Sequence, residues 1–454
     1  MEKIRQKPIE IIKTYVIVFL TVTMLVLAGI YIGGSQFTSR SAAINASPLP
    51  EGAVPVGFDP PVSVAVYEKD LLAISYAAIR YAGSGGGAYG CEAAASDLAK
   101  FAAEPIHKCL SSSAEMSRVG IGDFQRAIAS DKYIYISLAN DLPYQIIHAL
   151  TGEYGTAVGS EEAINVRHML LYFGDFGKTT LYLLSGDNCF ASSADYSMNI
   201  SELAAMSSDS RLSAFEIGKN GIALSGASPS IQRISLTKGV MPEGKEYSDL
   251  LEILDYSEME FQPRAVPWAN LVAPHGTVQM NSEKLLFTAS SDSGIAISDF
   301  LNDAKSELDI DMYDVLLASV ELLERMRQAY PAMTGGAFST YISGFYHEND
   351  VFTVEFGLCD GYMPLSGDAY PYLARFTVLS GKFKSIDLRF IGAERLGYTS
   401  LLFSSAWEYG YAAETYDIHS LGLRFKVDAL PKEELDARWY FTGEPLPFKE
   451  EVGE

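Results

Sequence analysis

Cysteine and histidine are both scarce in this sequence, which has four cysteines and six histidines among 454 residues. Small disulfide-stabilised domains need a far denser set of cysteines, and structural zinc sites need clustered ligands such as a Cys-x-x-Cys pair. No such pair occurs here. We therefore expect no metal and no cofactor. Cys91 and Cys109 are a candidate disulfide that would close a loop around the segment between them, and buried free thiols are the alternative.

Basic residues are also in deficit. The chain has 34 Lys and Arg against 57 Asp and Glu, and its formal net charge is −23. Nucleic-acid binding depends on the neutralisation of phosphates by Lys and Arg, so we expect no nucleic acid among the partners. A cationic ligand, or a protein with a basic surface, is compatible with this charge.

Recognisable catalytic motifs are missing as well. The segment Gly174–Thr180 (GDFGKTT) resembles a phosphate-binding loop, but Tyr172 stands where its first glycine should be, which favours a hairpin turn. His347 and Glu348 resemble the start of a zinc-protease motif, but Val351 replaces the second histidine. We therefore predict that the chain is not an enzyme. An extracytoplasmic hydrolase stays open as the alternative, because the many carboxylates could include a catalytic pair.

Long hydrophobic runs are absent except for one, at Tyr15–Ile32. No charged residue occurs between Lys13 and Arg40. Eighteen residues at ~1.5 Å rise form a helix of about 27 Å, enough to cross the core of a bilayer. The basic residues of the chain's start precede the run, namely Lys3, Arg5, Lys7 and Lys13. The positive-inside rule therefore predicts a cytoplasmic N-terminus and an extracytoplasmic bulk. The run is longer than the core of a secretory signal, and the flank offers only a poor cleavage site around Ser41–Ala43, so we expect an uncleaved single-pass anchor in the cell membrane, with a cleaved signal as the alternative.

The end of this run contains Gly29 and Gly33, which are four residues apart. Small residues at this spacing allow two membrane helices to approach closely, so both glycines are candidates for a helix–helix contact. The alternative is that glycine is simply common in membrane helices.

Composition along the chain predicts two extracytoplasmic domains. Serine, proline and glycine are frequent just after the anchor, and prolines also interrupt a second stretch near the middle of the chain. The predicted organisation is a cytoplasmic tail at 1–14, an anchor at 15–33, a spacer at 34–62, a first domain at 63–240, a linker at 241–270 and a second domain at 271–454.

Both domains are predicted to be α+β, with mainly antiparallel sheets packed against helices. Met312–Tyr330 has the clearest amphipathic pattern of a helix. Asp123 and Ser298 are candidate N-caps of shorter helices. The glycine run at 83–87 is predicted to be a flexible loop, and the acidic stretch at 307–314 a helix N-terminus rather than a calcium loop.

Four segments carry a resemblance to a known family: YIYISLANDLPYQII (Tyr133–Ile147), HMLLYFGDFGKTTLYLLSGD (His168–Asp187), GFYHENDVFTVEFGLCDGYMPLSGD (Gly344–Asp368) and ARFTVLSGKFKSIDLRF (Ala374–Phe390). Together with the anchor they resemble the YycH/YycI-type accessory regulators of a two-component cell-wall sensor kinase. The resemblance implies a non-catalytic protein that contacts a membrane kinase, partly through its anchor helix. We therefore expect a regulator or sensor for a membrane partner, with a ligand-binding module at the cell envelope as a further alternative.

Overall fold

The computed structural model describes residues 71–446, with gaps at 82–83, 90–92, 113–115, 131, 152–163, 175–176, 198, 208–214, 218–221, 257–267, 292, 302–309, 335–337, 362 and 433. The predicted anchor and spacer lie outside the described residues, and so does the candidate contact formed by Gly29 and Gly33. Among the helices that are described, none is long and apolar enough to cross a membrane. The anchor therefore stays a prediction.

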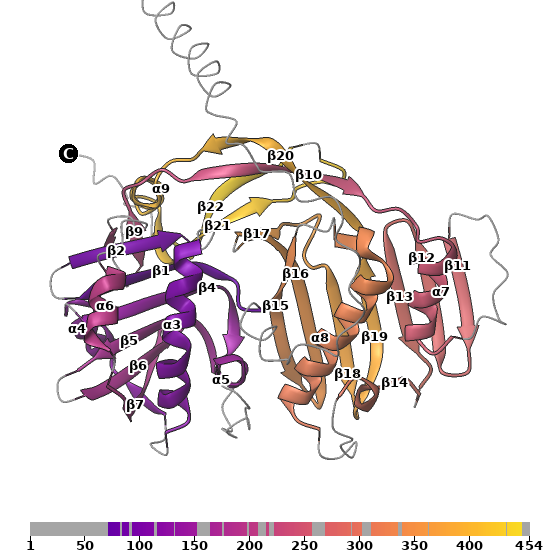
Figure 1. Ribbon diagram of the computed structural model, residues 1–454, viewed down its shortest axis with the longest axis horizontal. Coiled ribbons are helices and arrows are strands. Elements are labelled where there is room, and N and C mark those ends of the chain that lie inside the picture. Colours follow the sequence, from indigo (N-terminus) through magenta and orange to yellow (C-terminus); the bar gives the residue numbers. More distant parts are fainter. Residues whose placement is uncertain are drawn as a thin grey trace, which may run out of the picture. The chain divides into compact units, whose positions relative to one another are not determined.

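The first sheet is built from strands between residues 74 and 195 (Figure 1). Its seven strands are antiparallel and follow the order β2-β1-β4-β5-β6-β7-β3. The predicted hairpin at GDFGKTT is confirmed, because β5 pairs with β6 and Gly177 in the turn has a φ of +75°. The strands are β1 (Ile74–Tyr81), β2 (Ser84–Tyr89), β3 (Ser117–Val119), β4 (Lys132–Pro143), β5 (Asn165–Phe173), β6 (Lys178–Ser185) and β7 (Asn188–Asp195).

The two faces of this sheet are covered by different elements. Successive residues of a strand point to opposite faces, so Ile134 of β4 faces one side while Tyr133 and Tyr135 face the other. The aliphatic face packs against helices α3 (Ala93–Leu110), α5 (Tyr144–Thr151) and α6 (Ile200–Ser207). The tyrosine-rich face packs against α4 (Ile121–Ile128) and against residues near the C-terminus, including Ile418 and Leu421. The C-terminal part of the chain thus helps to bury the first sheet.

The second sheet uses strands from residue 268 onward and is antiparallel except for one parallel pair, β17 with β21. Its main order is β11-β12-β13-β19-β18-β16-β17-β21-β22, while β14 pairs with β19 and β15 with β16. The strands are β11 (Trp268–Ala273), β12 (Gly276–Asn281), β13 (Lys284–Ala289), β14 (Ile295–Ala296), β15 (Ser339–Glu348), β16 (Val351–Asp360), β17 (Met363–Ser366), β18 (Ala374–Leu379), β19 (Lys382–Arg389), β21 (Tyr416–Lys426) and β22 (Asp436–Pro445).

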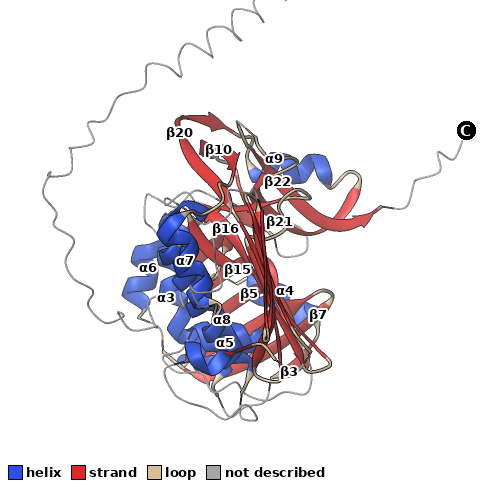
Figure 2. Ribbon diagram, turned by 90° about the vertical axis from the view of Figure 1, so that its right-hand side faces the viewer, coloured by secondary structure: helices blue, strands red, loops and turns tan. Residues whose placement is uncertain are grey.

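The predicted amphipathic helix is confirmed as α8 (Met312–Ala329), which packs on β16 and β18. It begins with a capping box, in which the Asp311 side chain accepts from the Asp314 N–H and the Asp314 side chain accepts from the Asp311 N–H. This confirms the interpretation of the acidic stretch as a helix start. Helix α7 (Gly244–Ile253) packs on α8. The short 3-10 turns η5 (Ile297–Phe300) and η6 (Pro331–Thr334) lie before and after α8 and contact it. Figure 2 shows α3, α5, α6, α7 and α8 on one side of the strands and α9 (Ser405–Ala412) on the other.

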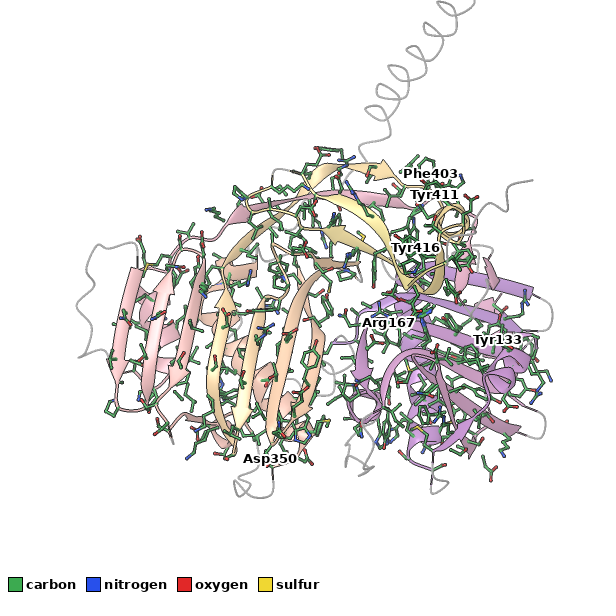
Figure 3. The ribbon with its side chains drawn as sticks, turned by 180° about the vertical axis from the view of Figure 1, so that it is seen from behind. Tyr133, Arg167, Asp350, Phe403, Tyr411 and Tyr416 are labelled. Carbon is green, nitrogen blue, oxygen red and sulfur yellow. The ribbon has the colours of Figure 1, made fainter. Side chains whose placement is uncertain are left out.

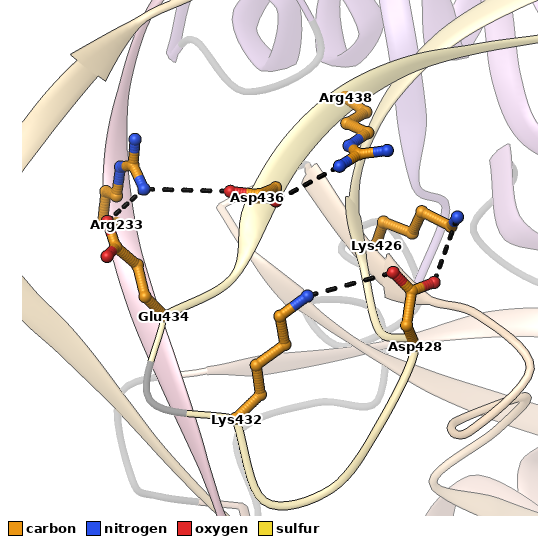
Figure 4. Close-up of polar contacts among 7 residues, drawn as sticks. All are labelled: Arg233, Lys426, Asp428, Lys432, Glu434, Asp436 and Arg438. Carbon is orange, nitrogen blue, oxygen red and sulfur yellow. Dashed lines mark hydrogen bonds and ion pairs between the residues drawn. The ribbon is translucent and has the colours of Figure 1, made fainter.

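A long antiparallel ribbon joins residues that are far apart in sequence, because β10 (Ser230–Lys238) pairs with β20 (Ile391–Leu401). A smaller pair, β8 (Phe215–Ile217) with β9 (Ala223–Ser225), precedes it. The loop after β21 runs beside β10, where the Leu435 N–H donates to the Ile234 carbonyl at 2.8 Å. Charged side chains gather at this crossing and form ion pairs (Figure 4), in one group Arg233, Glu434, Asp436 and Arg438, and in another Lys426, Asp428 and Lys432.

The α+β class is confirmed. Three local predictions were wrong. Residues 84–87 of the glycine run belong to the edge strand β2, because their backbone pairs with β1. Asp123 lies in the first turn of α4, and Gly120 is the N-cap. Ser298 lies inside η5, and Ala296 is the N-cap. The division into two domains stays a prediction; the described residues belong to one compact unit, in which one buried apolar cluster includes residues of both sheets.

Candidate functional site

Large apolar side chains that remain exposed are concentrated in one region. In the described part of the chain there are eleven such side chains, and seven come from two segments, residues 398–411 around the end of β20 and α9, and residues 441–446 at the end of β22 and just after it. The segments adjoin, because the Trp439 indole N–H donates to the Phe403 carbonyl at 2.8 Å and the Leu446 N–H donates to the Thr415 carbonyl at 2.8 Å. A concentration of this kind marks an interaction surface. The seven are Tyr398, Leu401, Phe403, Trp407, Tyr411, Phe441 and Leu446.

Three of these side chains stack on one another, and we call them the aromatic ladder: Phe403, Trp407 and Tyr411. The ring centroids of Phe403 and Trp407 are 4.3 Å apart with planes at 23°, and those of Trp407 and Tyr411 are 6.0 Å apart with planes at 3°. Their exposed fractions are 60%, 52% and 70%. Trp407 and Tyr411 are one turn apart on α9, whereas Phe403 precedes the N-cap residue Ser404 and stacks on Trp407; Figure 3 labels Phe403 and Tyr411.

The inner side of α9 is fixed to the rest of the fold. Ser404 caps the helix, its hydroxyl accepting from the Trp407 N–H at 3.3 Å. The Ser405 hydroxyl is buried, accepts from the Ser225 N–H at 2.8 Å and donates to the Ser225 carbonyl at 3.4 Å. Ala412 is buried in the same apolar cluster as the tyrosine-rich face of the first sheet. The ladder is therefore held in place before any partner binds, which lowers the entropic cost of binding.

The strand that follows α9 is fixed to the first sheet through His168. The ring of His168 donates to the backbone carbonyl of His419, and its Nδ1 lies 2.9 Å from the Tyr135 hydroxyl. The pairing of β21 with β22 shifts register between Ile418 and Ser420, which is where His419 lies. Burial, and secondarily the neighbouring Arg167 charge, lower the pKa of His168 to about 3. The ring is therefore neutral, and its two nitrogens connect β4 and β5 to β21.

Arg167 makes a second connection between the same elements. Its Nη2 donates to the Tyr440 hydroxyl at 3.0 Å, and that hydroxyl donates to the Ala139 carbonyl at 3.0 Å. Figure 3 labels Arg167 in the first sheet. Because Tyr440 belongs to β22, this chain of hydrogen bonds joins the first sheet to the C-terminal hairpin that supports the ladder.

The charge near the ladder is negative. Glu408 is half-buried on α9, and burial raises the pKa of its carboxyl. Glu414 and Glu444 are exposed. None of these three carboxylates forms an ion pair within the described part of the chain, unlike the acidic residues drawn in Figure 4. The surface thus combines aromatic rings with uncompensated carboxylates.

A second candidate site, separate from the ladder, is formed by Ser111 and two histidines. Its hydroxyl lies 2.8 Å from Nε2 of His148 and 3.2 Å from Nε2 of His107, and the two imidazole rings stack with centroids 4.8 Å apart. Burial and the neighbouring His107 lower the pKa of His148 to about 4. A hydroxyl beside a neutral imidazole is the geometry of a nucleophile and its base. However, Ser111 follows the C-terminus of α3, where the helix dipole opposes a developing oxyanion.

A cavity lies between the first sheet and helices α3 and α5. Its volume is about 40 Å³, far below the ~300 Å³ at which pockets for organic ligands begin. Its walls are aliphatic apart from Lys100 and Thr151, so it offers few groups that could orient a ligand. Among the residues with described positions, no three His, Cys, Asp or Glu side chains are grouped as metal ligands.

The candidate residues predicted from the sequence do not lie at the aromatic ladder. Gly29, Gly33 and Cys91 lie outside the described residues. Cys109 is buried in α3, its Sγ 3.6 Å from the Thr179 carbonyl, and it has no disulfide partner among the described residues. The helix–helix contact and the disulfide therefore stay predictions.

Sequence reasoning missed the ladder, although a signal was present. Phe403, Trp407 and Tyr411 recur at four-residue spacing, which is also the spacing of a buried helical stripe.

The chain matches no protein-family model and no curated protein in sequence. The resemblance to YycH/YycI-type regulators thus remains a prediction.

Proposed function

We propose that this chain is a non-catalytic, membrane-anchored extracytoplasmic protein that regulates or senses for a membrane partner, and that it contacts this partner through the aromatic ladder. A two-component sensor histidine kinase is the candidate partner implied by the resemblance. The anchor at Tyr15–Ile32 would hold both proteins in one membrane. This raises the effective concentration of one for the other, so a surface of modest affinity suffices.

The exposed ladder is the observation that supports this proposal most strongly. Tyrosine, tryptophan and phenylalanine are enriched at the centres of protein interfaces, where each buries a large area with few rotatable bonds. Elsewhere in the described chain, tyrosines such as Tyr133, Tyr135 and Tyr370 are fully buried. The three stacked side chains of the ladder, two on α9 and one just before its N-cap, are not buried in this way, because more than half of each remains exposed.

A hydrolase acting at the cell envelope is the second candidate, and the contact between Ser111 and His148 favours it. In the described part of the chain, His148 makes no hydrogen bond through its other ring nitrogen that would orient the imidazole as a base. The hydrogen bonds of Ser111 instead join the ends of α3 and α5, which is a structural role. We therefore assign function to the ladder.

Co-purification from membranes of the source cells tests the proposal. The full chain is compared with a variant carrying Trp407→Ala and Tyr411→Ala, and with a matched control carrying Val272→Ala, since Val272 is 77% exposed on β11. We expect one membrane protein to accompany the parent chain and the Val272 control but not the ladder variant. Equal recovery with all three chains would reject the ladder as the contact surface. A Ser111→Ala variant that loses hydrolysis of ester or peptide substrates would favour the hydrolase.

A further inference from the structure

The three exposed rings of the ladder have no cation over them in the described part of the chain. Arginine side chains lie over aromatic rings repeatedly in this fold. Arg375 and Arg389 lie 4.1 and 4.8 Å from the centroid of Tyr372, and Arg424 lies 4.6 Å from that of Tyr440. In the same described part, no Arg or Lys lies over Phe403, Trp407 or Tyr411. The ladder is thus an unoccupied surface of the kind that binds cations.

The local sequence strengthens this contrast. Between residues 396 and 417 there are acidic residues at Glu408, Glu414 and Asp417, and there is no Lys or Arg. Glu408 lies on α9 beside Trp407, and Glu414 follows the C-terminal end of the helix. The helix dipole places a partial negative charge at that same end. Three sources of negative potential therefore act near the rings: Glu408 on the helix, Glu414 after it, and the C-terminal end of the helix itself.

We propose that the aromatic ladder, together with Glu408 and Glu414, binds a cationic segment of the membrane partner, whose Arg or Lys side chains stack against the rings and pair with the carboxylates. This inference rests on the proposed function, because it names the chemistry of the partner at that same surface. Cations are attracted to the faces of Trp, Tyr and Phe rings, and the attraction strengthens when the interface excludes water. Arginine is the best fit, since its planar guanidinium both stacks on rings and forms paired hydrogen bonds with a carboxylate.

Charge decides against two other occupants of the surface. A bilayer rich in anionic lipid would be repelled by Glu408, Glu414 and the exposed Glu444, although exposed aromatic residues alone would suit a membrane interface. A second copy of this chain would bring the same carboxylates face to face, because a two-fold interface pairs a surface with itself. A basic partner removes both penalties.

Glu408 gives independent support to a cationic occupant. Its carboxyl is half-buried and has no ion-pair partner in the described structure, and the resulting desolvation raises its pKa. A bound guanidinium would stabilise the ionised form and lower this pKa again. The free protein therefore carries a partly desolvated carboxylate whose natural complement is a cation.

Binding of defined probes to the full chain in phosphatidylcholine nanodiscs tests the inference. The probes are a synthetic peptide of alternating arginine and leucine, a glutamate–leucine peptide of equal length, and vesicles containing phosphatidylglycerol. We expect only the arginine–leucine peptide to bind, with an affinity that falls as salt rises. Glu408→Gln combined with Glu414→Gln should weaken this binding roughly five-fold. The matched control, Glu348→Gln with Asp350→Asn at the β15–β16 turn, removes the same charge elsewhere and should leave it unchanged.

The outcomes separate this inference from the proposed function. Equal binding of both peptides, or equal loss in the α9 and control charge variants, would overturn the cationic partner while leaving the ladder as the docking surface. Binding of phosphatidylglycerol vesicles that requires Trp407 and Tyr411 would overturn it in favour of a lipid surface. If the Trp407→Ala, Tyr411→Ala variant still retains the membrane partner in co-purification, the proposed function itself fails.

Discussion

The buried imidazole of His168 should make the stability of the fold depend on pH in a way that one substitution removes. The pKa of this ring is lowered from 6.5 to about 3, mainly because burial disfavours the charged form. As the pH falls through 6.5, the unfolded chain takes up a proton at this position and the folded chain does not. Stability contributed by the neutral ring is therefore complete above pH 6.5 and declines toward pH 3.

The magnitude follows from the two pKa values. At pH 5 the protonated form of the unfolded ring exceeds its neutral form roughly thirty-fold, while the folded ring stays neutral. Going from pH 8 to pH 5 therefore lowers the free energy of unfolding by about 2 kcal/mol. His148, whose pKa is lowered to about 4, should contribute a similar loss in the same range. Replacing His168 by glutamine removes the pH-dependent loss of stability that comes from His168 and leaves the loss that comes from His148. The variant should thus be about 2 kcal/mol less sensitive to acid than the parent chain.

Urea unfolding of the full chain in mild detergent, at pH 8, 6.5 and 5, measures this difference. The quantity compared is the change in unfolding free energy from pH 8 to pH 5, so that any general destabilisation by the substitution cancels. His347→Gln is the matched control, because His347 lies at the exposed end of β15, stacked on Phe352. If the His168→Gln variant and the parent chain show the same pH dependence, the reasoning about the buried ring is wrong.

Three further predictions concern the surface, the core and the anchor. Trp407→Ala with Tyr411→Ala should change the free energy of unfolding by less than about 1 kcal/mol, since both side chains are exposed; a larger loss in urea unfolding would mean that the ladder is structural. Phe376→Ala should cost about 3–5 kcal/mol in the same assay, because the ring is fully buried and lies 5.8 Å from the centroids of both Phe356 and Phe383. Gly29→Ile with Gly33→Ile should weaken association of the anchor with itself or with a partner helix, as measured by energy transfer in vesicles, and an unchanged signal would reject these glycines as a contact.

Local patterns were sufficient to predict the elements whose neighbours are close in sequence. The hairpin around Gly177 follows from turn residues between two strand-like segments. Helix α8 follows from its apolar stripe and from the acidic residues at its start. The glycine run of β2 was assigned to a loop because glycine has low strand propensity, whereas pairing of its backbone with β1 decides the outcome.

The candidate site was hidden from sequence for a different reason. Aromatic residues at four-residue spacing indicate one face of a helix, but they do not say whether that face is buried. Burial is decided by Ser405 and Ala412, which fix the opposite side of α9 against residues more than a hundred positions earlier in the chain. Contacts of that range, such as the bond from His168 to the carbonyl of His419, leave no local pattern.

Site-specific photo-crosslinking in living cells tests the central claim most directly. A photoreactive phenylalanine analogue replaces Tyr411 in one full-length chain and Val272, the equally exposed position on β11, in another. We expect position 411 to form a crosslink to one integral membrane protein, identified by mass spectrometry, through a segment of that protein rich in Arg or Lys. Position 272 should not crosslink to this protein. Crosslinking of the same protein from both positions, or of no membrane protein from position 411, would contradict the claim that this chain acts by binding a membrane partner at the aromatic ladder.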